Sequence, residues 1–134
     1  MFDNDEFERW MAQASDTLNS ARQDYSYKSY NWCCFKAHQA AEYALKAILK
    51  GLGISAYGHS TVKLFKDLES YSLDIHKLIF YARILDRHYV PARYPDAFTE
   101  GSPFEFYDEK TAQEALDCAD KICDFCITIR KKYE

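Results

Sequence analysis

The segment 89–96, which reads Tyr-Val-Pro-Ala-Arg-Tyr-Pro-Asp, carries the residues with the clearest potential for chemistry. Its two prolines each fix φ at about −65° and restrict the residue before them, so the segment is predicted to be a rigid loop. The loop places the guanidinium of Arg93 between the phenol rings of Tyr89 and Tyr94. Arginine makes planar, bidentate contacts with phosphate or carboxylate groups, and aromatic faces stack on bases. The segment therefore indicates a contact site for a phosphate or a nucleotide.

A structural interpretation of the same loop stays open. Arg93 can instead form an ion pair with Asp86 or Asp96, while the tyrosines cover the end of a helical bundle. His59 precedes a predicted helix, and the favoured interpretation is structural: it can cap that helix through its backbone or contact the end of the following helix. On the ligand-binding interpretation, the candidate residues are Arg93, Tyr94, Asp96, Tyr89 and His59.

Arg83 and His88 form a second candidate constellation, spaced Arg-x4-His just before the proline-rich loop. Histidine titrates near neutral pH and can act as a general acid or base. Arginine can hold a phosphate or a developing oxyanion charge. Together they are the candidate catalytic residues for a metal-independent cleavage of RNA, with the ribose 2′-hydroxyl as nucleophile. The alternative is that Arg83 pairs with Asp86 and that His88 is solvated.

The cysteines and the remaining histidines do not predict a metal site. Cys118, Cys123 and Cys126 lie in one predicted helix without histidine, whereas zinc sites usually join ligand pairs across a turn. Free cysteines are usually buried, so these three are predicted core residues. His38 and Glu42 lie one helical turn apart and are predicted to form a surface or interface pair. We therefore expect neither a metal ligand set nor a cofactor.

The composition is typical of one compact helical domain spanning residues 1–134, because 48% of the residues are hydrophobic and Gly and Pro are scarce. A net charge of −4 argues against nucleic-acid binding driven by overall charge, although a local basic site remains possible. Five cysteines, an odd number, fall in helical patterns, which argues against a secreted disulfide scaffold. A signal-peptide pattern and an apolar run of membrane-spanning length are both missing, which predicts a cytoplasmic protein without membrane contact.

Apolar residues at helical spacing predict the elements that must position the candidate residues. We expect helices over about 4–25, 29–52, 60–71, 73–89 and 108–132, with a loop at 90–107. Asp3 or Asn4 is the predicted N-cap of the first helix, and Asp108 that of the last. Five alanines make the second helix slim, so that a neighbouring helix can approach it closely. The predicted fold class is all-α, an antiparallel up-and-down bundle of four to five helices.

Four stretches of the chain resemble the HEPN domain family of small α-helical proteins. They are Trp10 with Ala14 and Ala21, the segment 35–47 (Phe-Lys-Ala-His-Gln-Ala-Ala-Glu-Tyr-Ala-Leu-Lys-Ala), His59 leading into Leu64 and Leu68, and the segment 85–96. Together with the last helix they span nearly the whole chain, and the second and fourth stretches are specific in combination. The loop Tyr-x-Pro-x-Arg-Tyr-Pro-Asp marks the branch of the family that this chain most resembles.

The resemblance implies an up-and-down bundle that usually dimerises and binds nucleotides or RNA. It also implies a frequent association with a small nucleotidyltransferase, encoded alongside or fused. Many members of the family are metal-independent ribonucleases and components of toxin–antitoxin pairs with an Arg-x4-6-His motif, which Arg83 and His88 match in spacing. Toxin-type members commonly carry a tyrosine two residues after the histidine. Here Tyr89 follows His88 directly, and Val90 occupies that position.

Three hypotheses follow. The first is a nucleotide- or RNA-binding module, in which a homodimer presents Arg93, Tyr94 and the nearby His59 or Arg83 at a cleft for a nucleotide or for the substrate of a nucleotidyltransferase partner. The second is a metal-independent endoribonuclease of toxin type that uses Arg83 and His88. The third is a purely structural dimer whose interface is the alanine face of the second helix or the surplus of aromatic side chains.

Overall fold

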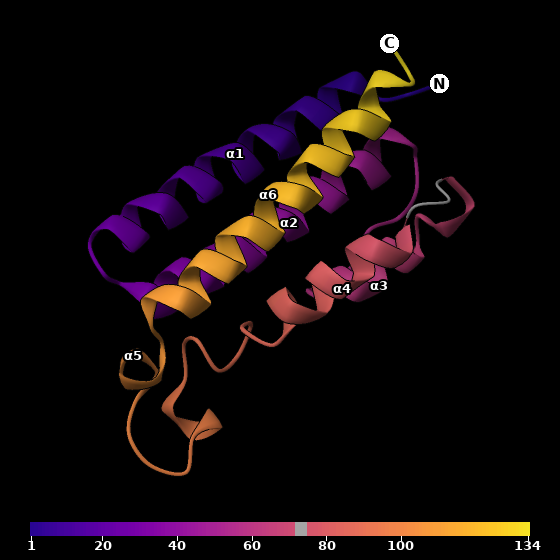
Figure 1. Ribbon diagram of the computed structural model, residues 1–134. Helices are drawn as coiled ribbons and strands as arrows, with labels where there is room; N and C mark the ends of the chain where they lie inside the picture. Colours follow the sequence, from indigo (N-terminus) through magenta and orange to yellow (C-terminus); the bar gives the residue numbers. More distant parts are fainter. Residues whose placement is uncertain (72–74) are drawn as a thin grey trace.

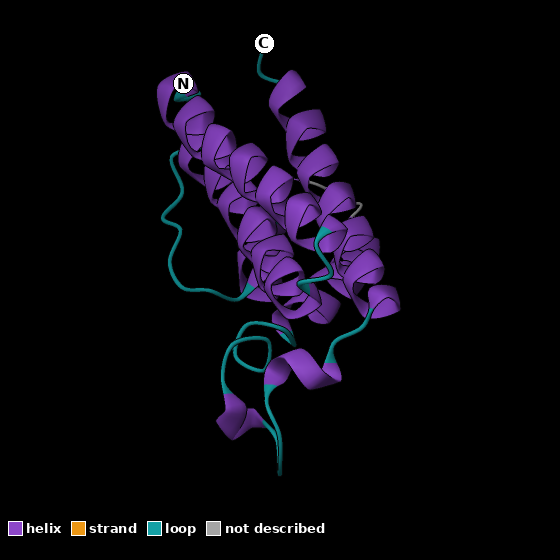
Figure 2. Ribbon diagram, turned by 90° about the vertical axis from the view of Figure 1, so that its left-hand side faces the viewer, coloured by secondary structure: helices purple, strands orange, loops and turns teal. Residues whose placement is uncertain are grey.

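The chain folds as a bundle of helices. The computed structural model describes residues 1–71 and 75–134, and this part of the chain contains helices and loops but no strand (Figure 2). The helices are α1 (Asn4–Ser26), α2 (Tyr30–Gly51), α3 (Thr61–Lys66), α4 (Ile75–Asp86), α5 (Pro103–Phe106) and α6 (Glu109–Lys131). Helices α1 and α2 form an antiparallel pair and α6 runs beside them, so both termini lie at the same end (Figure 1). The predicted all-α antiparallel bundle is confirmed.

The predicted helix boundaries hold for the three long helices but not around α3 and α4. The helix expected to reach residue 71 ends at Lys66, and Glu69–Tyr71 is a separate 3-10 helix. The expected start of the next helix at residue 73 lies outside the described residues. That helix ends at Asp86 instead of Tyr89, because the chain leaves the helix in consecutive turns ahead of Pro91, which cannot donate a helical hydrogen bond.

The loop expected at 90–107 holds two short helical segments that the prediction missed. These are the 3-10 helix Pro95–Ala97 and helix α5. Each begins at a proline, whose fixed φ suits the first helical position and whose missing N–H is not needed there. The side chain of Glu105 accepts a hydrogen bond from the backbone N–H of Ser102 at 3.3 Å, which closes the first turn of α5. The whole connection lies at the end of the bundle away from the termini (Figure 1).

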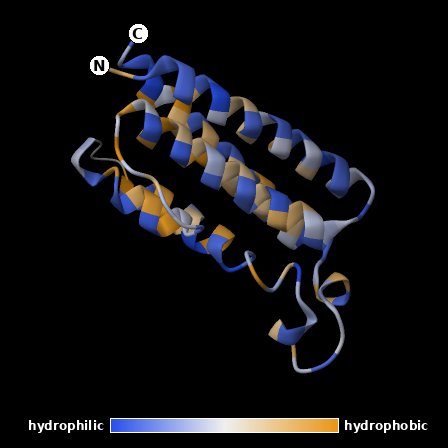
Figure 3. Cartoon of the chain, turned by 180° about the vertical axis from the view of Figure 1, so that it is seen from behind, coloured by the Kyte–Doolittle hydropathy of each residue, from blue (hydrophilic) through white to orange (hydrophobic). Residues whose placement is uncertain are grey.

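Side-chain caps fix the starts of α1, α3 and α6. Asp3 accepts from the N–H of Glu6, and Asp108 accepts from the N–H of Thr111, so Asp3 and Asp108 are confirmed as N-caps. Ser60 caps α3 by accepting from the N–H of Lys63. Hydrophilic and hydrophobic residues alternate along the long helices, as amphipathic helices in a bundle require (Figure 3).

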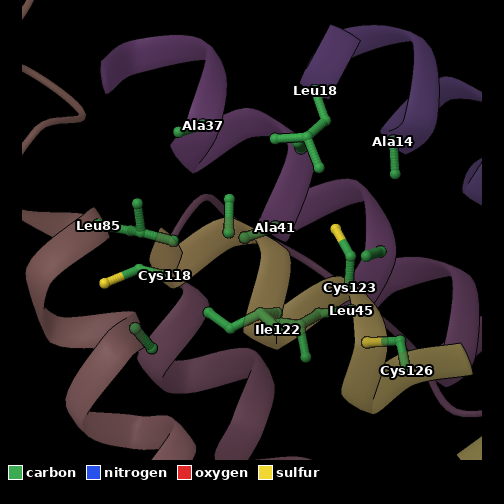
Figure 4. Packing of buried hydrophobic residues seen from close by; sticks show 14 of the residues in the cluster. Ala14, Leu18, Ala37, Ala41, Leu45, Leu85, Cys118, Ile122, Cys123 and Cys126 are labelled. Carbon is green, nitrogen blue, oxygen red and sulfur yellow. The ribbon is translucent and has the colours of Figure 1, made fainter. Parts of the chain in front are cut away.

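Helix α2 is the central helix of the bundle. Its alanine face, made of Ala37, Ala40, Ala41, Ala44 and Ala47, is fully buried against the rest of the chain. Figure 4 shows Ala37, Ala41 and Leu45 of this helix beside side chains of α1 and α6. The alanine face is therefore used inside the bundle and is not available as the dimer interface that the third hypothesis considered.

All five cysteines are buried, which confirms the predicted core role of Cys118, Cys123 and Cys126 (Figure 4). Burial raises the pKa of Cys33, Cys118 and Cys123 to about 12, and it raises the pKa of the other two thiols as well. The thiols therefore stay protonated at neutral pH. Because the thiolate is the nucleophile and the metal ligand, these cysteines act as apolar packing groups.

Across residues 1–71 and 75–134, none of the helices is both long enough and apolar enough to cross a membrane.

Candidate functional site

Arg93 lies in a cage of aromatic rings at the end of α4. Its guanidinium carbon is 4.3 Å from the ring centroid of Phe35, 4.5 Å from that of Tyr89 and 4.9 Å from that of Tyr94. Its Nε donates a hydrogen bond to the carbonyl of Tyr89 at 2.8 Å. Among the described residues no ion pair joins Arg93 to Asp86 or Asp96, so the structural interpretation of the loop does not hold in that form. The terminal nitrogens of the guanidinium are left without a partner in the same part of the chain.

A hydrogen bond from α2 holds the loop that carries Arg93. The side-chain amide of Asn31 donates to the carbonyl of Ala92 at 3.1 Å, and Ala92 is completely buried. The backbone N–H groups of Arg93 and Tyr94 both donate hydrogen bonds to the carbonyl of Val90, at 3.0 and 3.2 Å. These contacts fix the backbone on both sides of Arg93, so the main chain that carries its side chain is already ordered.

Asp86, the last residue of α4, gathers hydrogen bonds from two other elements. Its carboxylate accepts from Ser60 Oγ at 2.8 Å, from Thr61 N and Oγ1 at 2.8 and 2.7 Å, and from Val62 N at 3.2 Å. It also faces Nε2 of His38 at 3.1 Å. Burial on its own raises the pKa of Asp86, but the hydrogen bonds, that of His38 first, outweigh it and lower the pKa to about 2. Asp86 thus joins α4 to α2 and to the start of α3.

A second carboxylate, that of Glu42, is buried on α2 one helical turn from His38, whereas the carboxylate of Asp86 is 22% exposed. The Glu42 carboxylate accepts from Lys46 Nζ at 3.0 Å and lies 3.1 Å from Nδ1 of His59. The side chain of Glu42 is only 3% exposed, whereas that of His59 is 57% exposed. The predicted surface pair between His38 and Glu42 is wrong, because both side chains are buried and each bonds to a residue from another part of the chain.

Tyr89 joins these groups into one site. Its ring is stacked on that of His59, with centroids 4.9 Å apart and an interplanar angle of 16°, and it lies 5.1 Å from that of His38. The same ring contacts the guanidinium of Arg93. His59 therefore contacts the residues just after α4, one of its two expected roles, while the side-chain cap of α3 comes from Ser60. The structure thus brings together four of the predicted ligand-binding residues: His59, Tyr89, Arg93 and Tyr94.

Asp96 lies apart from this group. It is exposed in the 3-10 helix Pro95–Ala97, and among the described residues it forms no ion pair. The residues of the site that the sequence did not reveal are Asn31, Phe35, His38, Glu42 and Asp86. A signal was present for three of them, because Phe35, His38 and Glu42 follow one another at spacings of three and four along α2 and so share one face.

Arg83 and His88 are not joined by any contact within the described part of the chain. Arg83 is exposed on α4, whereas His88 is buried and its Nδ1 lies 2.9 Å from the hydroxyl of Tyr107. Burial, followed by the charges of His38 and Arg87, lowers the pKa of His88 from 6.5 to about 4, so its ring is neutral at physiological pH. The alternative of an Arg83–Asp86 pair with a solvated His88 does not hold either, because Asp86 bonds elsewhere and His88 is buried.

The buried His88 makes stability depend on pH. The unfolded chain takes up a proton at this residue below pH 6.5, but the folded chain does so only below about pH 4. The stabilisation is therefore complete above pH 6.5 and is lost as the pH falls from 6.5 toward 4. We expect His88 alone to lower the free energy of unfolding by about 2 to 3 kcal/mol between pH 7 and pH 4.5.

Urea unfolding of the native chain and of His88→Gln at both pH values measures this loss. Glutamine does not titrate, so the variant is expected to lose less stability between the two pH values by that amount. Equal losses in the two proteins would contradict a buried, neutral His88.

A shallow groove of about 800 Å³ lies elsewhere, along α4 and α6. Its lining includes Phe80, Tyr81 and Ile84, the carboxylates of Asp108, Glu109, Glu114 and Asp117, and the amine of Lys110. Four carboxylates outweigh one lysine and repel phosphate groups, so this groove does not suit an anionic ligand. Within residues 1–71 and 75–134, no group of three or more His, Cys, Asp and Glu side chains is arranged to hold a metal ion.

Comparisons with known proteins agree on one family. The model of the HEPN domain matches residues 7–132. Three similar solved structures are TT1696 from Thermus thermophilus, ST0689, described as an archaeal HEPN homologue, and the HEPN domain protein TM0613 from Thermotoga maritima. Their identities to this chain are 37%, 35% and 32%, and their TM-scores are 0.84, 0.77 and 0.74. The matches cover 92%, 91% and 92% of this chain and 97%, 95% and 98% of the other chains. No curated protein matches the chain.

Proposed function

The chain belongs to the HEPN domain family, helical modules of nucleotide- and RNA-related proteins, and from this premise we propose that it binds the phosphate of a nucleotide or RNA at Arg93. Tyr94, Tyr89 and His59 complete the proposed site, and Asp96 stays a predicted member, exposed in the 3-10 helix that follows Tyr94. We also place the chain in the branch of the family marked by the loop Tyr-x-Pro-x-Arg-Tyr-Pro-Asp, whose arginine is Arg93.

The proposal rests on the aromatic contacts and the hydrogen bonding of the Arg93 guanidinium. It is held by three aromatic rings and by one hydrogen bond from Nε, but its terminal nitrogens have no partner in the described part of the chain. The rings displace water from the cation, and a charge in such surroundings attracts an anion more strongly than a fully hydrated one does. A planar fork of free N–H donors matches the oxygens of a phosphate.

His59, which also packs against the ring of Tyr89, supplies a second donor. Glu42 occupies Nδ1 of the ring, and the stack on Tyr89 fixes the ring plane, so Nε2 is the nitrogen left for a ligand. Because Arg93 also contacts the ring of Tyr89, both donors are neighbours of the same tyrosine side chain. A buried carboxylate that orients an exposed histidine is an arrangement that proteins use where the histidine must meet another group in a fixed direction.

A calorimetric titration of the native chain with ATP and with inorganic tripolyphosphate tests the proposal. We expect both to bind, and we expect Arg93→Ala to weaken both by at least about tenfold, because a hydrogen bond to a charged group contributes about 1.5 to 3 kcal/mol. Arg9→Ala is the matched control, since Arg9 is an exposed arginine on α1 paired with Glu6. Unchanged affinity in Arg93→Ala, with the fold intact by circular dichroism, would refute the site.

The remaining parts of the hypothesis stay predictions. A homodimer and a small nucleotidyltransferase partner are implied by the family resemblance, and we propose both as the setting in which the site works. The ribonuclease alternative also stays a prediction. Its two residues are not brought to a common point by any described contact, because Arg83 is exposed on α4 and His88 is buried against Tyr107. Nucleotide or RNA binding is therefore the function that the geometry supports best.

A further inference from the structure

The aromatic surface around Arg93 extends beyond the cage to Trp32, in the first turn of α2. The indole ring stands edge-on to the ring of Phe35, with centroids 6.1 Å apart and an interplanar angle of 85°. Phe35 in turn lies under the guanidinium of Arg93. Trp32 is nevertheless 43% exposed, a large fraction for a side chain that gains so much from burial. One ring therefore separates a solvent-exposed indole from the cation.

Tyr94 provides a second exposed ring in contact with the same cation. It is 50% exposed, and its ring centroid lies 4.9 Å from the guanidinium carbon of Arg93. Phe35 and Tyr89, the other two rings of the cage, are only partly exposed and form its inner wall. Two exposed aromatic side chains from different elements therefore lie near the cation: Tyr94, from the loop after α4, contacts it, and Trp32, from α2, is one ring away.

We propose that Trp32 and Tyr94 are base-stacking surfaces next to the Arg93 phosphate site, so that the preferred ligand is a single-stranded nucleic acid with at least two adjacent nucleotides. The inference rests on the proposed function, because it takes the phosphate contact at Arg93 as given. Stacking on an aromatic ring tolerates any base, since every base has a π face, and the contact therefore selects single strands and not a sequence.

Two further observations favour a single strand over a duplex. In a duplex the base faces are covered by neighbouring base pairs, so exposed rings at the surface of the protein have nothing to stack on. Duplex binding depends instead on many phosphate contacts spread over a basic surface, whereas this chain has a net charge of −4. With about one phosphate on Arg93, the logarithm of the binding constant is expected to fall with the logarithm of salt concentration with a slope of about −0.7.

Tryptophan fluorescence tests the inference. The chain has two tryptophans, so Trp10→Phe leaves Trp32 as the sole emitter, and Trp10 packs elsewhere, near Tyr43 and Lys50. We expect a short single-stranded oligouridylate to quench the emission of Trp32, and inorganic tripolyphosphate, which has no base, to leave it unchanged. The same strand annealed to its complement is expected to bind more weakly than the single strand.

The variant Trp32→Ala separates this inference from the proposed function. We expect it to lower the affinity for oligouridylate by about fivefold or more, as the loss of one stacked base does. Its affinity for tripolyphosphate should stay within about twofold of native. Unchanged oligouridylate affinity in Trp32→Ala would overturn the inference, and so would an equal loss for both probes, which would make Trp32 a support for the cage. If the native chain binds neither probe, the proposed function fails and the stacking inference fails with it.

Discussion

Replacing Asp86 by alanine is expected to lower the free energy of unfolding by about 2 to 3 kcal/mol, because several hydrogen-bond donors lose the partly buried carboxylate that they share. Four donors from Ser60, Thr61 and Val62 lose their acceptor, and His38 loses its carboxylate. Helix α3 is too short to be stable alone, so losing the contacts at its start is expected to detach it from α4. Urea unfolding at neutral pH measures the effect.

Asp120→Ala is the matched control for this prediction. Asp120 also joins two helices, through Arg22, but the two side chains are 43% and 47% exposed, and the expected loss is below about 1 kcal/mol. The pH dependence gives a second check. The pKa of Asp86 is lowered from 3.8 to about 2, so its contribution is present above about pH 4 and is lost as the pH falls toward 2, by about 2 kcal/mol. A loss in Asp86→Ala no larger than in Asp120→Ala would contradict the role given to Asp86.

Glu42→Ala is expected to lower the free energy of unfolding by about 3 kcal/mol, because a buried charge is left unpaired. The charge left behind is that of Lys46, whose side chain is only 11% exposed. The same change frees Nδ1 of His59, so the ring loses its fixed direction beside Arg93. We therefore expect weaker binding of tripolyphosphate in addition to the loss of stability.

Two variants separate these effects. Glu42→Gln keeps an oxygen acceptor and nearly the same volume, and its loss of stability is expected to be smaller than that of Glu42→Ala. His59→Ala leaves the Glu42–Lys46 pair in place, so it is expected to weaken binding with little effect on stability. If Glu42→Ala unfolded within about 0.5 kcal/mol of the native chain, the buried carboxylate would have no structural role.

The long helices were predictable because their apolar residues repeat at helical spacing, a pattern that can be read from the local sequence. The residue at which α4 ends could not be predicted in this way. Apolar side chains continue at helical spacing to Tyr89, but the hydrogen bonds of Asp86 to α3 and the proline at 91 end the helix three residues earlier. The two short helices in the loop after α4 were missed because a proline marks a turn as readily as a first helical residue.

The candidate site was also predictable in part, because several of its residues lie close together in one loop. Proline, arginine and tyrosine in one loop predict a rigid cationic surface, and the structure places His59, Tyr89, Arg93 and Tyr94 together there. The roles of Glu42 and Asp86 escaped prediction because carboxylates are normally exposed and solvated. Their partners lie far away in sequence: His38 and Asp86 are 48 residues apart, and Glu42 and His59 are 17 apart. Only the packing of α2 against α3 and α4 brings them together.

The most direct test of the account is an NMR titration that follows arginine side-chain Nε–H signals while tripolyphosphate is added. The Nε–H of Arg93 is hydrogen-bonded to the carbonyl of Tyr89, which slows its exchange with water and makes it observable, and Arg93→Lys assigns the signal by removing it. We expect this signal and the ring signals of His59 and Tyr94 to shift together, while the backbone N–H signal of Arg9 stays in place. Shifts confined to other residues, such as Phe80 and Tyr81 in the acidic groove, or no shift at Arg93 at all, would contradict a phosphate site at Arg93.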